Sequence, residues 1–236
     1  YYLDILPGVI ISNARKRLFL VSPQDGSSRP LSQKVLDRPN LIRRIRSLIP
    51  DHDRAHMVPF NTTDLERKLA VRLGIPMYAA DPRFFASGTK SGARHIFTEE
   101  GVKHPLGFED LYSVQEIASS IVKMRAQRPI DQVVVKLNEG VSGLGNALLN
   151  LENLPLPGAA DEAEAIGKRM TRMRFEAEET TYAEYAEKLE YTGAIVEEYI
   201  SGVESYSPSV QLRVTPLGEV EMLSTHDQML GGHSGQ

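Results

Sequence analysis

Apolar side chains recur at helical spacing after Thr63 and after Ser113, two residues of the kind that cap helices. Thr63 precedes a run whose leucines fall on one face, and Glu66 completes a capping-box pattern. Gly74 follows this run as a stop signal. A short helix is expected over 91–100, ending at Gly101. Ser113 and Glu116 repeat the capping-box pattern and predict a longer helix.

Composition predicts a further helix over residues 161–190. This stretch is rich in Glu, Ala, Lys and Arg, which have high helix propensity. Pro155 and Pro157 lie just before it and give it a rigid entry. We therefore expect one long helix here.

Runs of β-branched and aromatic residues alternate with these helices and predict strands. The last two runs flank Thr215-Pro216-Leu217-Gly218, which suits a type I turn and joins them as a hairpin. Helices packed on a sheet define the fold class as α/β (α+β). The expected strands are 17–22, 75–80, the two apolar runs within 133–149, 194–200, 208–214 and 219–224.

The overall composition argues against several classes of function. A net charge of −4 over 236 residues gives no reason to expect a nucleic-acid partner. No apolar run approaches the roughly 20 residues of a membrane-spanning helix. The chain has no cysteine, which excludes disulfides and thiolate metal sites and fits a reducing, cytoplasmic location. The segment DHDRAH (51–56) holds metal-ligating residue types, but it is more typical of turn chemistry, so no metal site is assigned.

The segment VVVKLNEGVSGLGNALL (133–149) carries the clearest chemistry. A β-branched strand ends at Lys136, and the loop that follows has glycines at 140, 143 and 145. Glycines let backbone N–H groups point together at an anion, and a lysine beside them adds a compact positive charge. The pattern predicts a phosphate-binding β-hairpin, although a plain Gly/Asn-rich hairpin loop remains the alternative.

Three familiar phosphate motifs do not fit this loop. No Gly-Lys-Ser/Thr tripeptide occurs, so it is no P-loop. Its glycines are spaced Gly-x-x-Gly-x-Gly and a strand follows, unlike a dinucleotide fingerprint. Protein kinases place the lysine after the glycine loop, whereas Lys136 precedes it.

Four segments together resemble the ATP-grasp family, specifically the carboxylate–amine ligases related to pheganomycin-type peptide ligases. Each segment is moderately specific, and their order and spacing carry the resemblance. They are GTKSGARHIFTEEGVKHPLG (88–107), VVVKLNEGVSGLGN (133–146), IVEEYISGVE (195–204) and PSVQLRVTPLGEVEML (208–223).

The resemblance implies which residues meet the phosphates. Lys90 and Lys136 match the two family lysines that reach nucleotide phosphates, although Lys90 taken alone suits a surface position at a helix entry. Two ammonium groups can offset the charge of a transferring phosphoryl group. The loop with Gly140, Gly143 and Gly145 resembles the family's flexible flap, and Ser142 can donate a further hydrogen bond.

The resemblance also implies an adenine and ribose site. Backbone groups around Glu198 and Ile200 would recognise adenine, and the Glu197 side chain would bind its exocyclic amine. Apolar contact would come from Val196, Tyr199 and Ile200. An ordinary strand with two solvated carboxylates is the alternative. Glu204 matches the family acid that accepts hydrogen bonds from both ribose hydroxyls. Arg213 is a weaker catalytic candidate for steering a phosphate or carboxylate.

By the same resemblance the chain reads as a piece of a longer protein, because the family holds Mg²⁺ with an Asp … Glu-x-Asn arrangement expected beyond Gln236. Catalysis by these residues alone is therefore doubtful. The expected division is an incomplete preceding α/β domain (1–88), linker helices of the ATP-grasp core (89–129), an ATP-binding lid (130–200) and the start of a C-terminal subdomain (201–236).

The implied activity is an ATP-dependent carboxylate–amine ligase that acts through an acylphosphate. Its partners would be ATP, Mg²⁺ and small-molecule or peptide carboxylates and amines; the oligomeric state is left open. Two alternatives remain: an ATP-binding regulatory or scaffold protein, and another ATP-grasp reaction such as carboxylate–thiol ligation.

Overall fold

The structure of the chain is a computed structural model that describes residues 2–5, 7–140, 144–202, 206–215 and 217–229. The chain divides into two compact units, Tyr1–Phe85 and Ala86–Gln236. None of the helices in these described ranges is long and apolar enough to cross a membrane.

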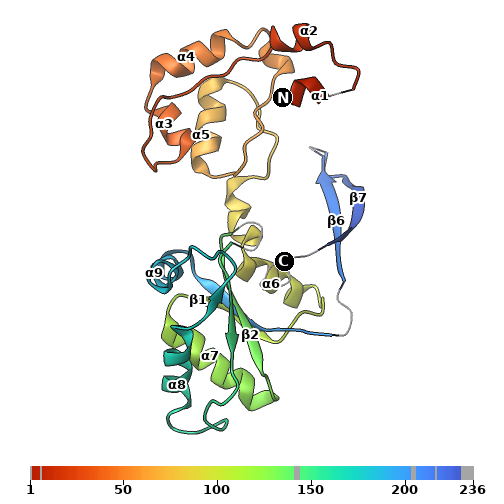
Figure 1. The fold of residues 1–236 in the computed structure, drawn as a ribbon. Coiled ribbons are helices and arrows are strands. Elements are labelled where there is room, and N and C mark those ends of the chain that lie inside the picture. The colour runs from red at the N-terminus through yellow and green to blue at the C-terminus, as the bar shows by residue number, and fades with distance from the viewer. Residues whose placement is uncertain (1, 6, 141–143, 203–205, 216, 230–236) are drawn as a thin grey trace. The chain divides into compact units, whose positions relative to one another are not determined.

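The first unit is helical. Its core consists of Val35, Ile42, Leu69 and Leu73, contributed by three helices that lie together in Figure 1. Its helices are α1 (Tyr2–Ile5), α2 (Ile11–Arg15), α3 (Leu31–Leu36), α4 (Pro39–Ser47) and α5 (Asp64–Leu73), with a 3-10 turn at His52–Arg54 and another, η2, at Pro82–Gly88.

Helix α5 confirms the capping prediction. The Thr63 hydroxyl accepts a hydrogen bond from the Leu65 N–H, and the Glu66 carboxylate accepts one from the Thr63 N–H. Gly74 ends the helix with φ of 72°, a left-handed conformation that costs glycine little. Asp51 accepts from the Asp53 N–H, which is turn chemistry. No group of three metal-ligating side chains occurs among the residues that the structure describes.

Two predicted strands of this unit are wrong. Residues 18–26 form no regular element, and Leu20 is 86% exposed. Residues 75–80 contribute only an isolated bridge between Met57 and Met77. Both segments carry apolar residues of strand type, but neither has a ladder partner among the described residues, and a strand needs such a partner to satisfy its backbone groups.

The second unit is built on a five-stranded antiparallel sheet with the strand order β1-β5-β2-β3-β4. This arrangement of helices on an antiparallel sheet confirms the mixed α and β class. The strands are β1 (Gly107–Leu111), β2 (Gln132–Leu137), β3 (Asn146–Asn150), β4 (Arg174–Phe175) and β5 (Ala194–Glu198); the helices are α6 (Lys90–Glu99), α7 (Val114–Gln127), α8 (Glu162–Met170) and α9 (Tyr182–Thr192).

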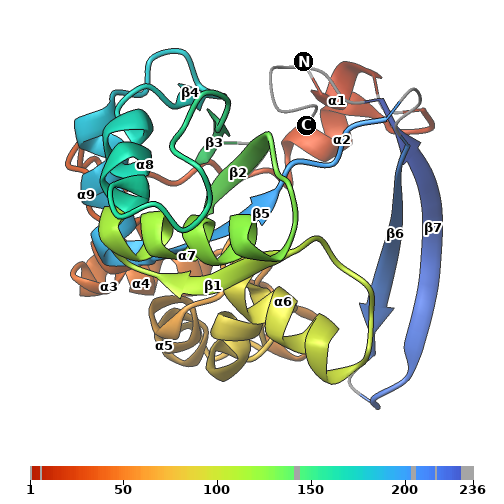
Figure 2. The same cartoon turned by 90° about the horizontal axis from the view of Figure 1, so that it is seen from below.

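The core covers one face of this sheet. Alternating residues of β2, Val133 and Val135, are fully buried against Ile117 and Ile121 of α7. Figure 2 shows α7 and α8 lying over the sheet on this side. Because side chains alternate along a strand, Lys136 and its cross-strand neighbours project from the opposite face.

The predicted long helix over 161–190 is instead two helices separated by β4. A second capping box, formed by Thr181 and Glu184, begins α9. Between the helices, Phe175 pairs with Ala147 of β3 and its ring packs 5.0 Å from that of Tyr185. The pairing of β4 with β3 thus interrupts the expected helix, and tertiary structure overrides helix propensity at this point.

The predicted C-terminal hairpin forms a separate two-stranded sheet, β6 (Ser207–Val214) with β7 (Val220–Gln228). Its turn is closed by a hydrogen bond from the Gly218 N–H to the Thr215 carbonyl oxygen at 2.9 Å.

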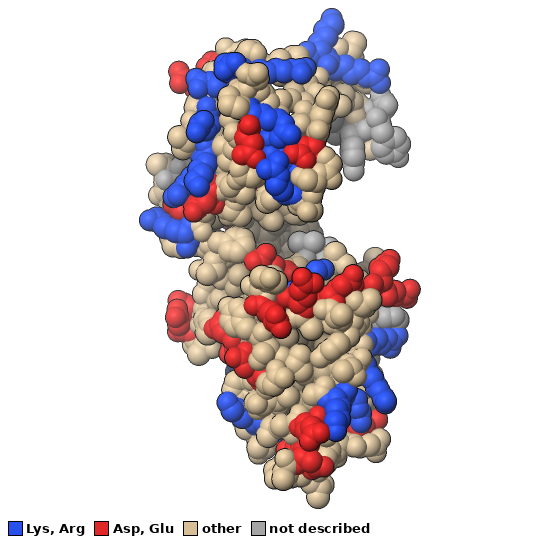
Figure 3. Space-filling model, turned by 90° about the vertical axis from the view of Figure 1, so that its left-hand side faces the viewer, with Lys and Arg blue, Asp and Glu red and all other residues tan. Residues whose placement is uncertain are grey.

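The two units carry opposite charge, which the overall value of −4 conceals. Residues 1–85 hold 14 Lys and Arg against 8 Asp and Glu, whereas residues 86–236 hold 13 against 23. In Figure 3 basic side chains dominate the visible face of the first unit and acidic ones are more frequent on the second. A functional site for an anion in the second unit therefore requires a local gathering of cations.

Candidate nucleotide-binding site

Lys136 lies on the sheet face opposite the core, beside Glu197 of the neighbouring strand β5. Its Nζ is 2.5 Å from Glu197 Oε1, and both side chains are mostly buried. The ion pair is diagonal, because Lys136 stands directly opposite Ile195 and Glu197 is two residues further along β5.

Lys90 reaches the same place from the first turn of α6. A Cβ built on Gly140 would lie 3.7 Å from Lys90 Nζ, so the amine lies near the start of the glycine loop. Burial lowers the pKa of Lys90, the nearby charge of Lys136 lowers it further, and Glu197 partly offsets both effects. The two predicted lysines therefore converge on one face of the sheet.

Asn138 ties the helix of Lys90 to the strand of Lys136. Its buried side-chain oxygen accepts hydrogen bonds from the Ser91 N–H at 3.0 Å and the Ser91 hydroxyl at 2.8 Å. Its amide nitrogen donates to the Thr192 carbonyl oxygen. Ser91 follows Lys90 by one residue, and Asn138 follows Lys136 by two. This network therefore fixes the backbone segments that carry both amines.

The glycine loop is tight where the structure describes it. A Cβ on Gly140 would lie 2.1 Å from the Leu144 carbonyl oxygen, so only glycine fits there. Gly145 has φ of 93° and its carbonyl oxygen accepts from the Leu137 N–H. Ser142 and Gly143 lie outside the described residues.

Sequence reasoning missed Arg94 and Glu109. Arg94 is 4% exposed and lies one helical turn beyond Lys90. It donates to Glu109 at 2.6 Å and to Glu197 at 3.0 Å. The available signal was the spacing of Ser91 and Arg94, which puts two polar residues on the same face of α6 as the helix turns.

At the end of β5, Glu198 and Ile200 occupy different environments. The Glu198 N–H donates to the Leu106 carbonyl oxygen, and its carboxylate pairs with Arg128. Ile200 is 67% exposed beyond the strand. Val196 is fully buried in the core on the other face, so its expected contact with adenine is wrong. Glu204 lies outside the described residues.

Arg213 lies in the β6–β7 hairpin and forms an ion pair with Glu221 across it. Its Nε is 2.7 Å from Glu221 Oε2. A neighbouring carboxylate thus already balances the charge of the Arg213 guanidinium.

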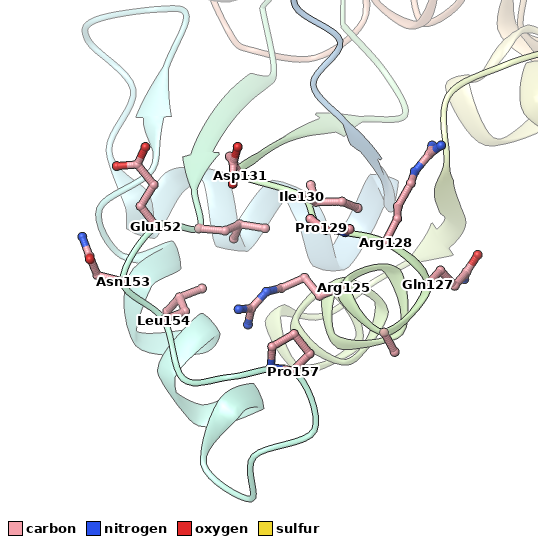
Figure 4. A pocket seen from close by; sticks show the side chains of 12 residues that line it. Arg125, Gln127, Arg128, Pro129, Ile130, Asp131, Glu152, Asn153, Leu154 and Pro157 are labelled. Carbon is pink, nitrogen blue, oxygen red and sulfur yellow. The ribbon is translucent and has the colours of Figure 1, made fainter.

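One described cavity lies elsewhere, at the opposite ends of β2 and β3. It has a volume of about 730 Å³, and Figure 4 shows Arg125, Leu154 and Pro157 among the side chains around it. Arg125 is already satisfied by the buried Glu162 and the Pro155 carbonyl oxygen. A smaller cavity of about 320 Å³ shares part of this wall and extends to Glu198 and Tyr199.

The second unit thus combines an antiparallel sheet and helices with two lysine side chains that lie close to Gly140 of a glycine-rich hairpin. Residues 85–191 match the model of the IQCH-like ATP-grasp family. This match confirms the predicted resemblance to ATP-grasp proteins for the part of the chain that holds Lys90, Lys136 and the glycine loop.

Similar proteins extend the comparison over most of the chain. The chain is 28% identical over 228 residues to L-propargylglycine–L-glutamate ligase of Streptantibioticus cattleyicolor, covering 94% of this chain and 45% of the ligase. It is 25% identical over 253 residues to IQ motif-containing protein H of Danio rerio, covering 93% of this chain and 24% of that protein. The chain thus spans less than half the length of these curated relatives.

Among solved structures, the chain is similar to D-alanyl-alanine synthetase A from Vibrio cholerae. The TM-score is 0.46 with 11% sequence identity, over 75% of this chain and 45% of the synthetase.

Proposed function

We propose that this chain is the nucleotide-binding part of an ATP-dependent carboxylate–amine ligase. The observation that carries the proposal is the convergence of Lys90 and Lys136 beside Gly140, on the sheet face opposite the core. In the part of the chain that the structure describes, no carboxylate lies within ion-pair distance of Lys90. An anionic ligand would supply the missing counter-charge, and a polyphosphate has the charge and length to meet both amines.

The proposed reaction has two steps. A substrate carboxylate oxygen attacks the γ-phosphorus of ATP, and the bond to the β,γ-bridging oxygen breaks to give an acylphosphate and ADP. The amine nitrogen then attacks the acyl carbon, loses a proton and releases inorganic phosphate. Lys90 and Lys136 would hold the phosphate tail and offset the charge that develops during transfer.

Adenine and ribose would bind toward the end of β5. The family resemblance supports roles for the backbone of Glu198 and Ile200 and for the Glu204 carboxylate, whereas the Glu197 side chain already faces Lys136 and Arg94. Magnesium, when bound, would neutralise phosphate charge, and it needs oxygen ligands. The described residues offer the cations of this site and no group of three His, Asp or Glu side chains for a metal.

The relatives support a ligase more directly than the alternatives. The name L-propargylglycine–L-glutamate ligase describes the joining of two amino acids by that relative. The present chain would join a carboxylate substrate and an amine substrate that the name does not identify. The similarity to IQ motif-containing protein H and the IQCH-like family keeps a nucleotide-binding protein without ligase chemistry as a second candidate. Carboxylate–thiol ligation would use the same phosphate site.

Calorimetric titration of ATP tests the binding site directly. Because Lys136 supplies a phosphate-facing charge, Lys136→Ala should weaken ATP binding at least about tenfold, or about 1.4 kcal/mol. Lys103→Ala is the matched control, since Lys103 is an exposed lysine of the same unit. Equal ATP affinity in wild type and Lys136→Ala would contradict the site.

Phosphate release separates the two candidate functions. We expect the full-length protein to release phosphate from ATP only when both an amino-acid or peptide carboxylate donor and an amine acceptor are present. Binding of ATP without phosphate release across a panel of such pairs would favour the nucleotide-binding regulator.

A further inference from the structure

Arg94 is the most enclosed cation beside the proposed phosphate site. Its guanidinium has three acceptors: Nε donates to Glu109 Oε1 at 2.6 Å, Nη1 to Glu197 Oε2 at 3.0 Å, and Nη2 to the Pro105 carbonyl oxygen at 3.1 Å. A planar guanidinium fixes the directions of these bonds, which a lysine ammonium cannot reproduce. Arg94 therefore holds Glu197 in one orientation.

Glu197 is shared between this fixed cation and a second, longer one. Its Oε2 accepts from Arg94, and its Oε1 is 2.5 Å from Lys136 Nζ. If Lys136 moved away, Glu197 would still be paired with Arg94, so no buried carboxylate would be left without a partner. An unpaired buried charge is strongly destabilising, and Arg94 removes that penalty.

We propose that Arg94 is a positioning residue that makes Glu197 an exchangeable counter-ion for Lys136. In the ligand-free chain Lys136 is ion-paired with Glu197. When the phosphate tail of ATP arrives, the ammonium turns from the carboxylate to a phosphate oxygen while Arg94 keeps Glu197 in place and paired. This inference rests on the proposed function, because it requires a polyphosphate at Lys136.

Two substitutions should act in opposite directions. Arg94→Met leaves Lys136 as the ion-pair partner of Glu197, so the ammonium is held more firmly and polyphosphate binds more weakly. Glu197→Gln keeps a side-chain oxygen that can accept from Arg94 but removes the charge that retains Lys136. Polyphosphate should then bind at least as tightly as in wild type.

The experiment is calorimetric titration of inorganic tripolyphosphate, which has no adenine, and of ATP into the wild type and these variants. We expect Arg94→Met and Arg94→Lys to weaken tripolyphosphate binding at least about tenfold, and Arg94→Met/Glu197→Gln to recover most of that loss. Recovery in the double variant distinguishes positioning from general damage, which a second substitution would not repair. Arg67→Met, which removes an exposed arginine paired with Asp64 at 3.0 Å, is the matched control.

Several outcomes would overturn the role of Arg94. They are wild-type affinity in folded Arg94→Met, wild-type affinity in Arg94→Lys, or a double variant no better than Arg94→Met. If Arg94→Met does not fold, Glu197→Gln decides, and a tenfold loss of tripolyphosphate affinity in it contradicts the inference. A wild-type chain that binds neither ligand contradicts the proposed function itself.

Discussion

At the scale of single residues, the two lysines were predictable and their surroundings were not. Lys90 and Lys136 belong to short segments whose sequence alone resembles ATP-grasp motifs. Arg94, Glu109 and Asn138 act through contacts between α6, β1 and β2, and those contacts depend on tertiary packing. A charged residue in an amphipathic helix gives little local indication that its side chain is buried.

The lowered pKa of Lys90 predicts a pH dependence of ATP binding. Burial and the charge of Lys136 lower this pKa below the ordinary value of 10.5, and bound phosphates would raise it again. Between the two pKa values the complex holds a proton that the free chain has lost. ATP binding should therefore take up protons at alkaline pH, and ATP affinity should fall as pH rises through that range.

Calorimetry at alkaline pH in two buffers of different ionisation enthalpy measures this proton uptake. Lys90→Arg is the control, because a guanidinium stays charged throughout the range and should show less uptake. Equal uptake in wild type and Lys90→Arg would assign the effect to another group.

At the scale of elements, helix ends were predicted better than strands. The Thr63 capping box and the Ser113 cap use side chains within three residues of one another, so the sequence contains the whole interaction. Strands need partners that lie far along the chain, and residues 18–22 and 75–80 have apolar patterns without a described ladder. The second capping box, formed by Thr181 and Glu184, is visible in the sequence and marks the start of a new helix. The high helix propensity of residues 161–190 favoured one continuous helix instead.

Gly193 lies at the boundary between α9 and β5, next to the Asn138 side chain. It has φ of 68° and ψ of 174°, and an added Cβ would lie 2.8 Å from a Tyr112 ring carbon and 2.9 Å from the Asn138 amide nitrogen. Gly193→Ala should therefore lower the free energy of unfolding by more than about 2 kcal/mol and disturb the network that holds Ser91.

Urea denaturation measures this loss, with Gly167→Ala as the matched control. Gly167 lies inside α8 with open space around it, so alanine there should stabilise the chain by up to about 1 kcal/mol. A Gly193→Ala variant as stable as wild type would show that the strand end adapts to a side chain.

At the scale of the whole molecule, each unit has a core of its own, and the proposed chemistry lies in one of them. The first unit packs around Val35, Ile42, Leu69 and Leu73, and the second packs one sheet face against α7 and α8. The other face carries the cations, within a unit whose net charge is negative. Overall composition therefore gives no indication of the proposed anion site, whereas the alternation along β2 predicts that Lys136 lies on the face opposite the core.

Hydrogen exchange with and without ATP tests the central claim across the whole chain at once. We expect ATP to slow exchange together at the start of α6, in the β2–β3 hairpin and at the end of β5, with no matching protection in the helices of residues 1–85. Protection confined to residues 125–131 and 151–157, around the cavity of about 730 Å³, would place the nucleotide elsewhere and contradict the account.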